Sequence, residues 1–157
     1  MTERNKEAYC GLYCGACPVY LKREGDWIVQ VVVEQYGLSF EALRCEGCRS
    51  DVLSPSCMDC GIRDCAQRKG LDSCAPCGEF PCKEIAGFGA VRPHGAEAVP
   101  NLKAIRRDGA EQWRIDQAAH WACNQCGTVG SWYEQVCPTC GSVLPSGWAQ
   151  DPHKSLL

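Results

Sequence analysis

The sequence predicts a small metal-stapled α+β protein, and two observations lead to this prediction. Fifteen of the 157 residues are cysteine. The spacing C-x2-C occurs six times, and a gap of two residues lets both sulfurs of a pair reach one ion. We therefore expect an irregular cysteine-rich module with short helices over residues 1–90, a helical linker over 91–120, and a C-terminal zinc ribbon with a tail over 121–157.

The apolar content of the chain is consistent with folding around metal. The hydrophobic share is 45% with cysteine included, and it falls to roughly a third without cysteine, below the usual range for a compact domain. Pro, Gly and Cys also interrupt residues 1–90 so often that long regular elements can hardly form there. Ions or cross-links must then offset part of the conformational entropy lost on folding.

The cysteine count and the first residues favour free thiols over disulfides. Thiols persist in the reducing cytosol, where they are available to metals. Residues 1–7 are charged and lack the apolar stretch of a secretion signal, and the longest strongly apolar run, 27–33, is too short to span a bilayer. An odd number of cysteines would also leave one without a disulfide partner. We expect a cytoplasmic protein with no membrane contact.

Helix signals in the cysteine-rich module are short. Asp26 is a good N-cap and Gly37 a good C-terminal stop, which predicts a helix over 27–36. Further short helices are expected over 62–69 and from about 81 to 87.

Residues 91–120 contain no cysteine and have the clearest helical pattern. Leu102, Ile105 and Trp113 fall roughly on one face, and Gly109 is expected to divide the segment into two helices. The basic residues of this segment are interspersed with acids, so we interpret them as a solvated face rather than a nucleic-acid patch: Lys103, Arg106, Arg107 and Arg114.

The strongest metal signal lies near the C-terminus, where two C-x2-C-G motifs are separated by ten residues. Two such knuckles, joined by a hairpin over 130–136, place four sulfurs tetrahedrally around one ion, as in zinc ribbons. The softness of thiolate and the closed geometry favour zinc over iron, and a closed site has a structural role. The four ligands are Cys123, Cys126, Cys137 and Cys140.

Three aromatic residues lie in or beside this ribbon. They could form a platform for a partner, but we expect Trp121, Trp132 and Tyr133 to cover the ribbon's own small apolar face.

The eleven cysteines of residues 1–90 can be divided in several ways. The spacing favours one ion held by Cys45, Cys48, Cys57 and Cys60, and a second held by Cys65, Cys74, Cys77 and Cys82. Cys10, Cys14 and Cys17 then remain, in a C-x3-C-x2-C order that resembles the [4Fe-4S] motif of radical S-adenosylmethionine enzymes. The chain offers too few residues for the barrel of such an enzyme.

Two other partitions of these thiols stay open. Cys82 could complete the site of Cys10, Cys14 and Cys17, which would leave Cys65, Cys74 and Cys77 as a set of three. Bridging thiolates could instead join the ions into a shared multi-metal cluster.

Metal binding would make the chain more acidic. Its formal net charge is -3, and each zinc ion with four thiolates carries about -2, so three sites would bring the charge to roughly -9. An acidic chain without a run of Lys and Arg argues against nucleic acid and favours a protein partner. Basic residues near the cysteines are expected to neutralise thiolates instead: Arg44, Arg49, Arg63, Arg68, Lys69 and Lys83.

The sequence favours an interaction or adaptor module over an enzyme. It contains no Walker loop, dinucleotide-binding glycine fingerprint or serine nucleophile elbow, and His94, His120 and His153 are scattered singly. Two alternatives to a structural zinc protein stay open. One is an iron–sulfur redox protein with a cluster at Cys10/Cys14/Cys17, and the other is a thiol protein for metal storage or transfer.

The cysteine pattern closely resembles a family known as domain of unknown function 3795. The resemblance rests on CGLYCGACP at 10–18, CEGC at 45–48, C-x2-CGIRDC at 57–65 and CAPCGEFPC at 74–82. It covers residues 10 to about 88, and the helical linker and ribbon with Ser131-Trp132-Tyr133 resemble the longer members of this group. The resemblance implies cysteine ligation and domain boundaries, but no activity is established for the family.

Overall fold

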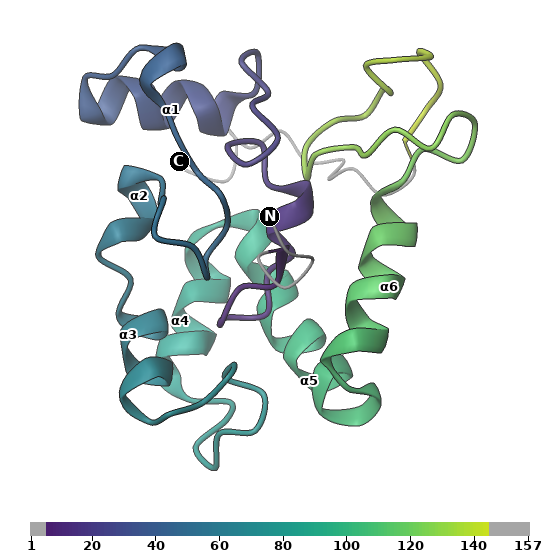
Figure 1. Ribbon diagram of the computed structural model, residues 1–157. Helices are drawn as coiled ribbons and strands as arrows, with labels where there is room; N and C mark the ends of the chain where they lie inside the picture. Colours follow the sequence, from purple (N-terminus) through teal and green to yellow (C-terminus); the bar gives the residue numbers. More distant parts are fainter. Residues whose placement is uncertain (1–5, 145–157) are drawn as a thin grey trace.

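The structure, a computed structural model, describes residues 6–144, and most of its regular structure is helical (Figure 1). The α-helices are α1 (Trp27–Tyr36), α2 (Pro55–Met58), α3 (Gly61–Arg68), α4 (Lys83–Val91), α5 (Ala98–Asp108) and α6 (Ala110–Trp121). The 3-10 helices η2, η3 and η4 span Cys14–Ala16, Phe40–Ala42 and Pro93–Glu97. The predicted tail over 145–157, with His153, and residues 1–5 lie outside the described residues.

Strand structure is sparse in the described part of the chain. It consists of isolated bridges that pair Glu7 with Tyr13, Ala122 with Val129, and Val136 with Val143. The protein is therefore small and mostly helical, and the β component of the predicted α+β class is not confirmed. The predicted hairpin over 130–136 is not confirmed, because this segment forms a turn and a bend, and its Val136 forms an isolated bridge with Val143 beyond the second pair of cysteines.

Local capping signals set the helix boundaries. The Asp26 side chain accepts a hydrogen bond from the Ile28 amide at 2.9 Å, and Gly37 ends α1 with a left-handed φ of 60°, so the predicted span 27–36 is confirmed. Helix α3 begins one residue earlier than predicted. Helix α4 begins at 83 and runs on past Gly87 to 91, because Ile85 and Phe88 both pack against the core.

The linker forms two helices, as predicted. Gly109 separates α5 from α6 with φ 87° and ψ 156°, a conformation that residues with a side chain rarely adopt. The predicted apolar face is buried: the exposed fractions of Leu102, Ile105 and Trp113 are 0%, 8% and 2%.

One hydrophobic cluster joins the three predicted parts of the chain. The three-part division stays a prediction, but residues of all three parts pack in this one cluster. A second, smaller cluster packs α1 against the segments on either side of it, through Val19, Val29, Val32 and Leu43. The buried members of the larger cluster, which we call the main cluster, are Ala8, Leu12, Tyr13, Ala16, Ala75, Ile85, Leu102, Ile105, Trp113, Trp121 and Trp132.

The first cysteine motif lies directly against α5. Gly11 has φ 85°, and a Cβ atom there would stand 2.7 Å from Leu102 Cγ and 2.9 Å from the Ala98 carbonyl oxygen. Asn101 donates from Nδ2 to the Gly11 carbonyl at 2.9 Å, and this hydrogen bond is buried. Glycine is required here for both conformation and space, so Cys10 and Cys14 are held close to the helical linker.

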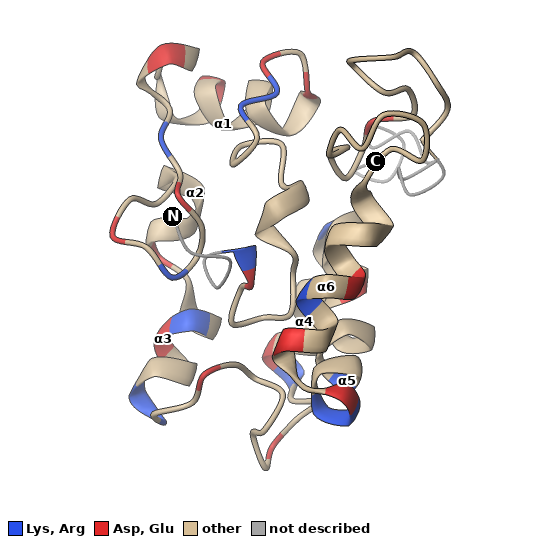
Figure 2. Cartoon of the chain, turned by 45° about the vertical axis from the view of Figure 1, so that its right-hand side comes forward, with Lys and Arg blue, Asp and Glu red and all other residues tan. Residues whose placement is uncertain are grey.

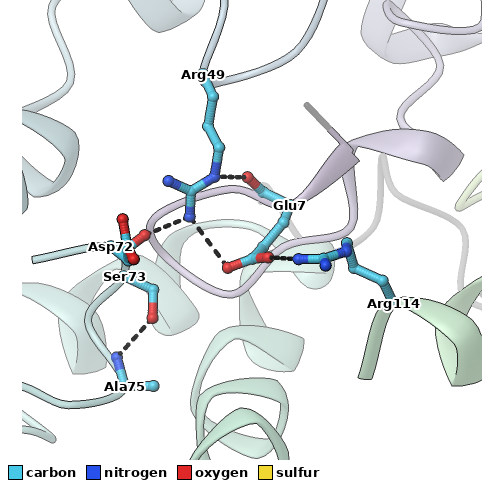
Figure 3. Close-up of polar contacts among 6 residues, drawn as sticks. All are labelled: Glu7, Arg49, Asp72, Ser73, Ala75 and Arg114. Atoms are coloured by element: carbon cyan, nitrogen blue, oxygen red, sulfur yellow. Dashed lines mark hydrogen bonds and ion pairs between the residues drawn. The ribbon is translucent and has the colours of Figure 1, made fainter. Parts of the chain in front are cut away.

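The buried Glu7 carboxylate lies between two arginines from distant segments (Figure 3). Its Oε1 is 3.0 Å from Arg49 Nη2, and its Oε2 is 2.6 Å from Arg114 Nη1. The side chain of Glu7 is 4% exposed, and that of Arg114 is 22% exposed. The interpretation of Arg114 as part of a solvated face is therefore wrong, because a buried carboxylate requires cationic partners and recruits this one from α6.

Elsewhere, acidic and basic residues both occur on α3, α4, α5 and α6, and the C-terminal turns carry little charge (Figure 2). None of the helices in the part of the chain that the structure describes is long and apolar enough to cross a membrane.

Candidate metal centres

Four cysteine sulfurs come together near the end of the described chain. The Sγ atoms of Cys123, Cys126, Cys137 and Cys140 all lie within 4.8 Å of one another. The Cys123–Cys140 and Cys126–Cys137 sulfur separations are each 3.6 Å. A tetrahedron with metal–sulfur bonds of about 2.3 Å has edges of about 3.8 Å. The four predicted ligands therefore have a spacing at which they could bind one ion.

Each pair of sulfurs belongs to a turn with the same hydrogen bonding. Gly127 donates to the Cys123 carbonyl at 2.8 Å, and Gly141 donates to the Cys137 carbonyl at 3.0 Å. Both glycines have a left-handed φ, of 75° and 74°. A β-bridge flanks each turn, between Ala122 and Val129 and between Val136 and Val143. The two C-x2-C-G motifs thus present their sulfurs from matching turns that face each other.

Hydrogen bonds lower the pKa values of two of these thiols. The Ser142 hydroxyl, 3.1 Å from Cys123 Sγ, acts with the N–H groups of Cys126 and Gln125 to lower the Cys123 pKa to about 6. The hydroxyl and N–H of Thr128 lower the pKa of Cys126. The thiolate is the metal-binding form of cysteine, so these contacts favour the ligand state of Cys123 and Cys126. Burial and the neighbouring sulfurs of Cys126 and Cys140 raise the pKa of Cys137 instead.

The segment that joins the two turns packs into the interior of the protein. Trp132 is 6% exposed and belongs to the main cluster, and its amide donates to the Ala16 carbonyl at 3.0 Å. Trp121 belongs to the same cluster. Tyr133 also packs against that cluster, so the expectation that Trp121, Trp132 and Tyr133 cover the ribbon's own face is wrong. The small buried cluster at the turns consists of Cys123, Cys137 and Leu144, which is too few residues to enclose an indole.

Polar contacts reinforce this junction. Arg23 Nε lies 2.9 Å from Glu134 Oε1, and Arg23 Nη2 donates to the Val129 carbonyl at 2.7 Å. The Ser131 hydroxyl lies 3.4 Å from Asp26 Oδ2, at the N-cap of α1. The C-terminal turns are therefore fixed to the start of α1, a contact that no sequence motif indicated.

The eleven N-terminal cysteines form a looser array of thiols. Among residues 6–144, the C-terminal four cysteines are the one group of three or more possible ligands that lie close enough together to hold an ion, and this array forms no such group. Burial raises the pKa values of Cys10 and Cys14 well above the usual range, that of Cys17 to about 12, and those of Cys57 and Cys74 to about 11, and neighbouring thiolates add to each rise. A nearby cation would be needed to keep such buried thiols ionised.

Backbone N–H groups point at several of these sulfurs. The donors are Leu12 to Cys10, Cys48 to Cys14, Val19 and Tyr20 to Cys17, and Tyr9 to Cys48. A hydrogen bond of this kind favours the charged form of its acceptor. The turns are thus arranged to stabilise thiolates, although the predicted grouping of these cysteines stays a prediction.

Several of the basic residues that were expected to neutralise thiolates do lie beside them. Lys69 Nζ is 3.7 Å from Cys77 Sγ. Burial raises the pKa of Cys48, and the charges of Arg63 and Arg49 counteract part of that rise. Two other basic residues donate to carbonyl groups of their own segments instead: Arg44 and Arg68.

Comparison with known proteins identifies the first half of the chain. The sequence model of a family described as "Protein of unknown function (DUF3795)" matches residues 6–87, which is slightly more than half of the chain. The resemblance seen in the cysteine pattern is confirmed over that segment. No curated protein and no solved structure matches the chain.

Proposed function

The chain belongs to the DUF3795 family of proteins of unknown function, and from this starting point we propose that it is a structural zinc protein that acts as an adaptor for another protein. One observation carries the proposal, which is the near-tetrahedral spacing of the four C-terminal sulfurs. Zinc prefers closed tetrahedral thiolate sites and has no redox chemistry of its own. An ion held in this way contributes folding free energy and leaves no position for a substrate.

The matching turns support a zinc ribbon over residues 121–144. Each turn supplies two sulfurs, and the buried apolar cluster between the turns is small, consisting of Cys123, Cys137 and Leu144. Apolar contacts alone would hold such a pair of turns together weakly. An ion bound by both turns would stabilise their association.

The surface of the ribbon supports a protein partner. Val129, Val136 and Val143 are 36%, 54% and 78% exposed, and they lie at the bridges that flank the two turns. Glu134 is the one charged residue within 122–144, although Arg23 donates to the Val129 carbonyl. The chain as a whole has a formal net charge of -3, which disfavours phosphate backbones. A protein with an apolar contact surface fits these features best.

Elemental analysis of anaerobically purified protein tests the zinc site. We expect at least one zinc per chain that survives dialysis against a weak chelator. A natively folded protein without zinc would contradict the proposal. The adaptor role is tested with Val136→Glu and Val143→Glu, which should weaken a specific partner complex while leaving the zinc content unchanged. If both variants bind that partner like the wild type, this surface is not the adaptor face.

A second candidate function is an iron–sulfur redox protein with a cluster at Cys10, Cys14 and Cys17. Their sulfurs accept backbone N–H groups, yet they are not gathered as closely as the ligands of one ion. In a cluster each thiolate binds its own iron, so the sulfurs stand farther apart. Absorption at about 400 nm and a paramagnetic signal on reduction would identify the cluster. Zinc as the only metal of the module would exclude it.

A further inference from the structure

Each sulfur of the first C-terminal turn contacts a sulfur of the second. Cys123 Sγ lies 3.6 Å from Cys140 Sγ, and Cys126 Sγ lies 3.6 Å from Cys137 Sγ. These two contacts share no atom, so together they use all four thiols. The four sulfurs all lie within 4.8 Å of one another, which makes pairing within each turn the competing arrangement.

Other polar contacts also hold the two turns face to face. The Thr128 hydroxyl, beside the first turn, donates to Thr139 Oγ1 of the second turn at 3.0 Å. The Ser142 hydroxyl, which follows the second turn, lies 3.1 Å from Cys123 Sγ. The anchored segment between the turns adds to these contacts. The facing arrangement therefore has support besides an ion.

Each of the two sulfur pairs joins an exposed cysteine to a buried one. Cys123 and Cys137 are 3% and 2% exposed, whereas Cys126 and Cys140 are exposed. Cysteine oxidation follows exposure, so an oxidant in solution reaches Cys126 and Cys140 first. The buried partner of each then lies beside the oxidised sulfur, where it can form a disulfide.

We propose that these four cysteines form a redox switch, in which hydrogen peroxide converts them into two disulfides that cross between the turns, Cys123–Cys140 and Cys126–Cys137. Peroxide oxidises the exposed thiol of a pair to a sulfenic acid and is reduced to water. The buried thiol attacks that sulfur, the S–S bond forms, and the sulfenic oxygen leaves as a second water. Each disulfide thus takes two electrons from its thiols and consumes one peroxide. Thiolates react in the same way and give hydroxide instead of water.

This switch goes beyond the proposed function, because it exchanges an ion for covalent links. A disulfide has no thiolate to offer, so zinc held by the four sulfurs leaves as Zn²⁺. The cross-turn bonds still join the turns, across 17 and 11 positions of the chain. Disulfides within each turn would release the ion as well, but only the small apolar cluster would then hold the turns together. The pairing therefore decides whether the oxidised turns stay associated. A reducing compartment would reverse the change.

Cleavage at Glu134 reports the pairing in the full wild-type chain. Glu134 separates the first cysteine pair from the second. Anaerobic protein is treated with hydrogen peroxide, its remaining thiols are alkylated, and it is digested with a glutamyl protease without reduction. We expect the two cysteine-bearing fragments to stay joined until a reductant is added, and tandem mass spectrometry should locate the two proposed bonds. Separate fragments, each with an internal disulfide, would overturn the proposal, as would alkylation of all four thiols.

The same oxidation of zinc-free chain unfolded in guanidinium is the control. Without folded turns, the cysteines nearest in sequence meet most often, so the fragments should separate. If the folded and the unfolded chain give the same pairing, the facing turns do not direct it, and the proposal is wrong.

Zinc content separates this inference from the proposed function. In the zinc-loaded protein, at least one ion per chain should be lost as the fragments become joined, and it should be bound again after treatment with a thiol reductant and zinc. Fragments that join in a chain that never held zinc would support the disulfide pairing and contradict the structural zinc protein. Zinc that stays bound, with all four thiols unchanged by peroxide, would overturn the switch and leave the proposed function in place.

Discussion

The indole of Trp132 stacks on the imidazole of His94, with ring centroids 4.5 Å apart and planes inclined by 18°. Trp132 lies between the two C-terminal turns, and His94 lies in η4, directly after α4. Tyr133 adds a hydroxyl 2.9 Å from His94 Nδ1. The stack anchors the candidate metal site to the helical part of the protein, so the two should lose structure together.

Replacing Trp132 with alanine should destabilise the whole protein. The side chain is 6% exposed within the main cluster, and removing a buried tryptophan costs about 3–5 kcal/mol. Guanidinium unfolding at saturating metal measures the change. Val143→Ala is the matched control, because Val143 is 78% exposed and such a change should stay within about 0.5 kcal/mol. Equal effects of the two variants would show that Trp132 does not anchor the turns.

His94 should make stability depend on pH. Burial, followed by the charge of Arg92, lowers the pKa of His94 to about 4, whereas an unfolded histidine has a pKa of about 6.5. As the pH falls from about 6.5 towards 4, the unfolded state takes up the proton first, so the stability contributed by neutral His94 is progressively lost. Over this window the wild type should lose roughly 1–3 kcal/mol more than His94→Gln.

Acid release of metal affects both proteins in that comparison, so the difference between their pH profiles is the quantity to measure. Nuclear magnetic resonance of the imidazole provides an independent check. The ring should remain neutral at pH 5.5, and a midpoint near 6.5 would refute the prediction.

Replacing Glu7 with glutamine should be costly, because it leaves two arginines without their shared carboxylate. Arg49 is 7% exposed, and removing one partner of a buried ion pair costs about 3–5 kcal/mol. Arg114→Gln should cost less, since Arg114 is 22% exposed. Denaturant unfolding measures both. Arg107→Gln is the control, because the side chain of Arg107 is 71% exposed. If Glu7→Gln is as mild as that control, the ion pairs do not contribute to stability.

Cys126→Ser should release one ion per chain, since an incomplete set of thiolates holds zinc weakly. Hydrogen exchange should then accelerate over residues 121–144, while α5 stays protected. Asn124→Ser changes an exposed residue of the same turn that supplies no sulfur, so it should keep its metal. Unchanged metal content in Cys126→Ser would show that Cys126 is not a ligand of the ion.

Features encoded by neighbouring residues could be predicted from the sequence. The N-cap at Asp26, the stop at Gly37 and the break at Gly109 each depend on one residue and its own backbone, and all three are confirmed. The four C-terminal sulfurs were predictable for the same reason. Each C-x2-C-G turn is a local structure, and ten residues between the turns are enough for them to face each other.

Contacts between distant residues could not be predicted in this way. Arg114 meets Glu7 across 107 positions of the chain, and nothing near Arg114 in sequence distinguishes it from a solvated arginine. Trp132 was assigned to the ribbon because sequence distance suggested it, but the larger apolar interior lies elsewhere. The order of the N-terminal cysteines likewise does not reveal which loops lie side by side.

The anchored segment 131–134 between the two turns affects whether the four ligands of an ion come from one molecule or from two. Each turn offers two sulfurs, so in principle an ion could join the first turn of one molecule to the second turn of another. Because Trp132 and Glu134 hold the joining segment in place, the second turn stays within reach of the first, at an effective concentration on the order of millimolar. If the candidate site binds an ion, both turns of the same chain are therefore expected to supply its ligands, even at high protein concentration.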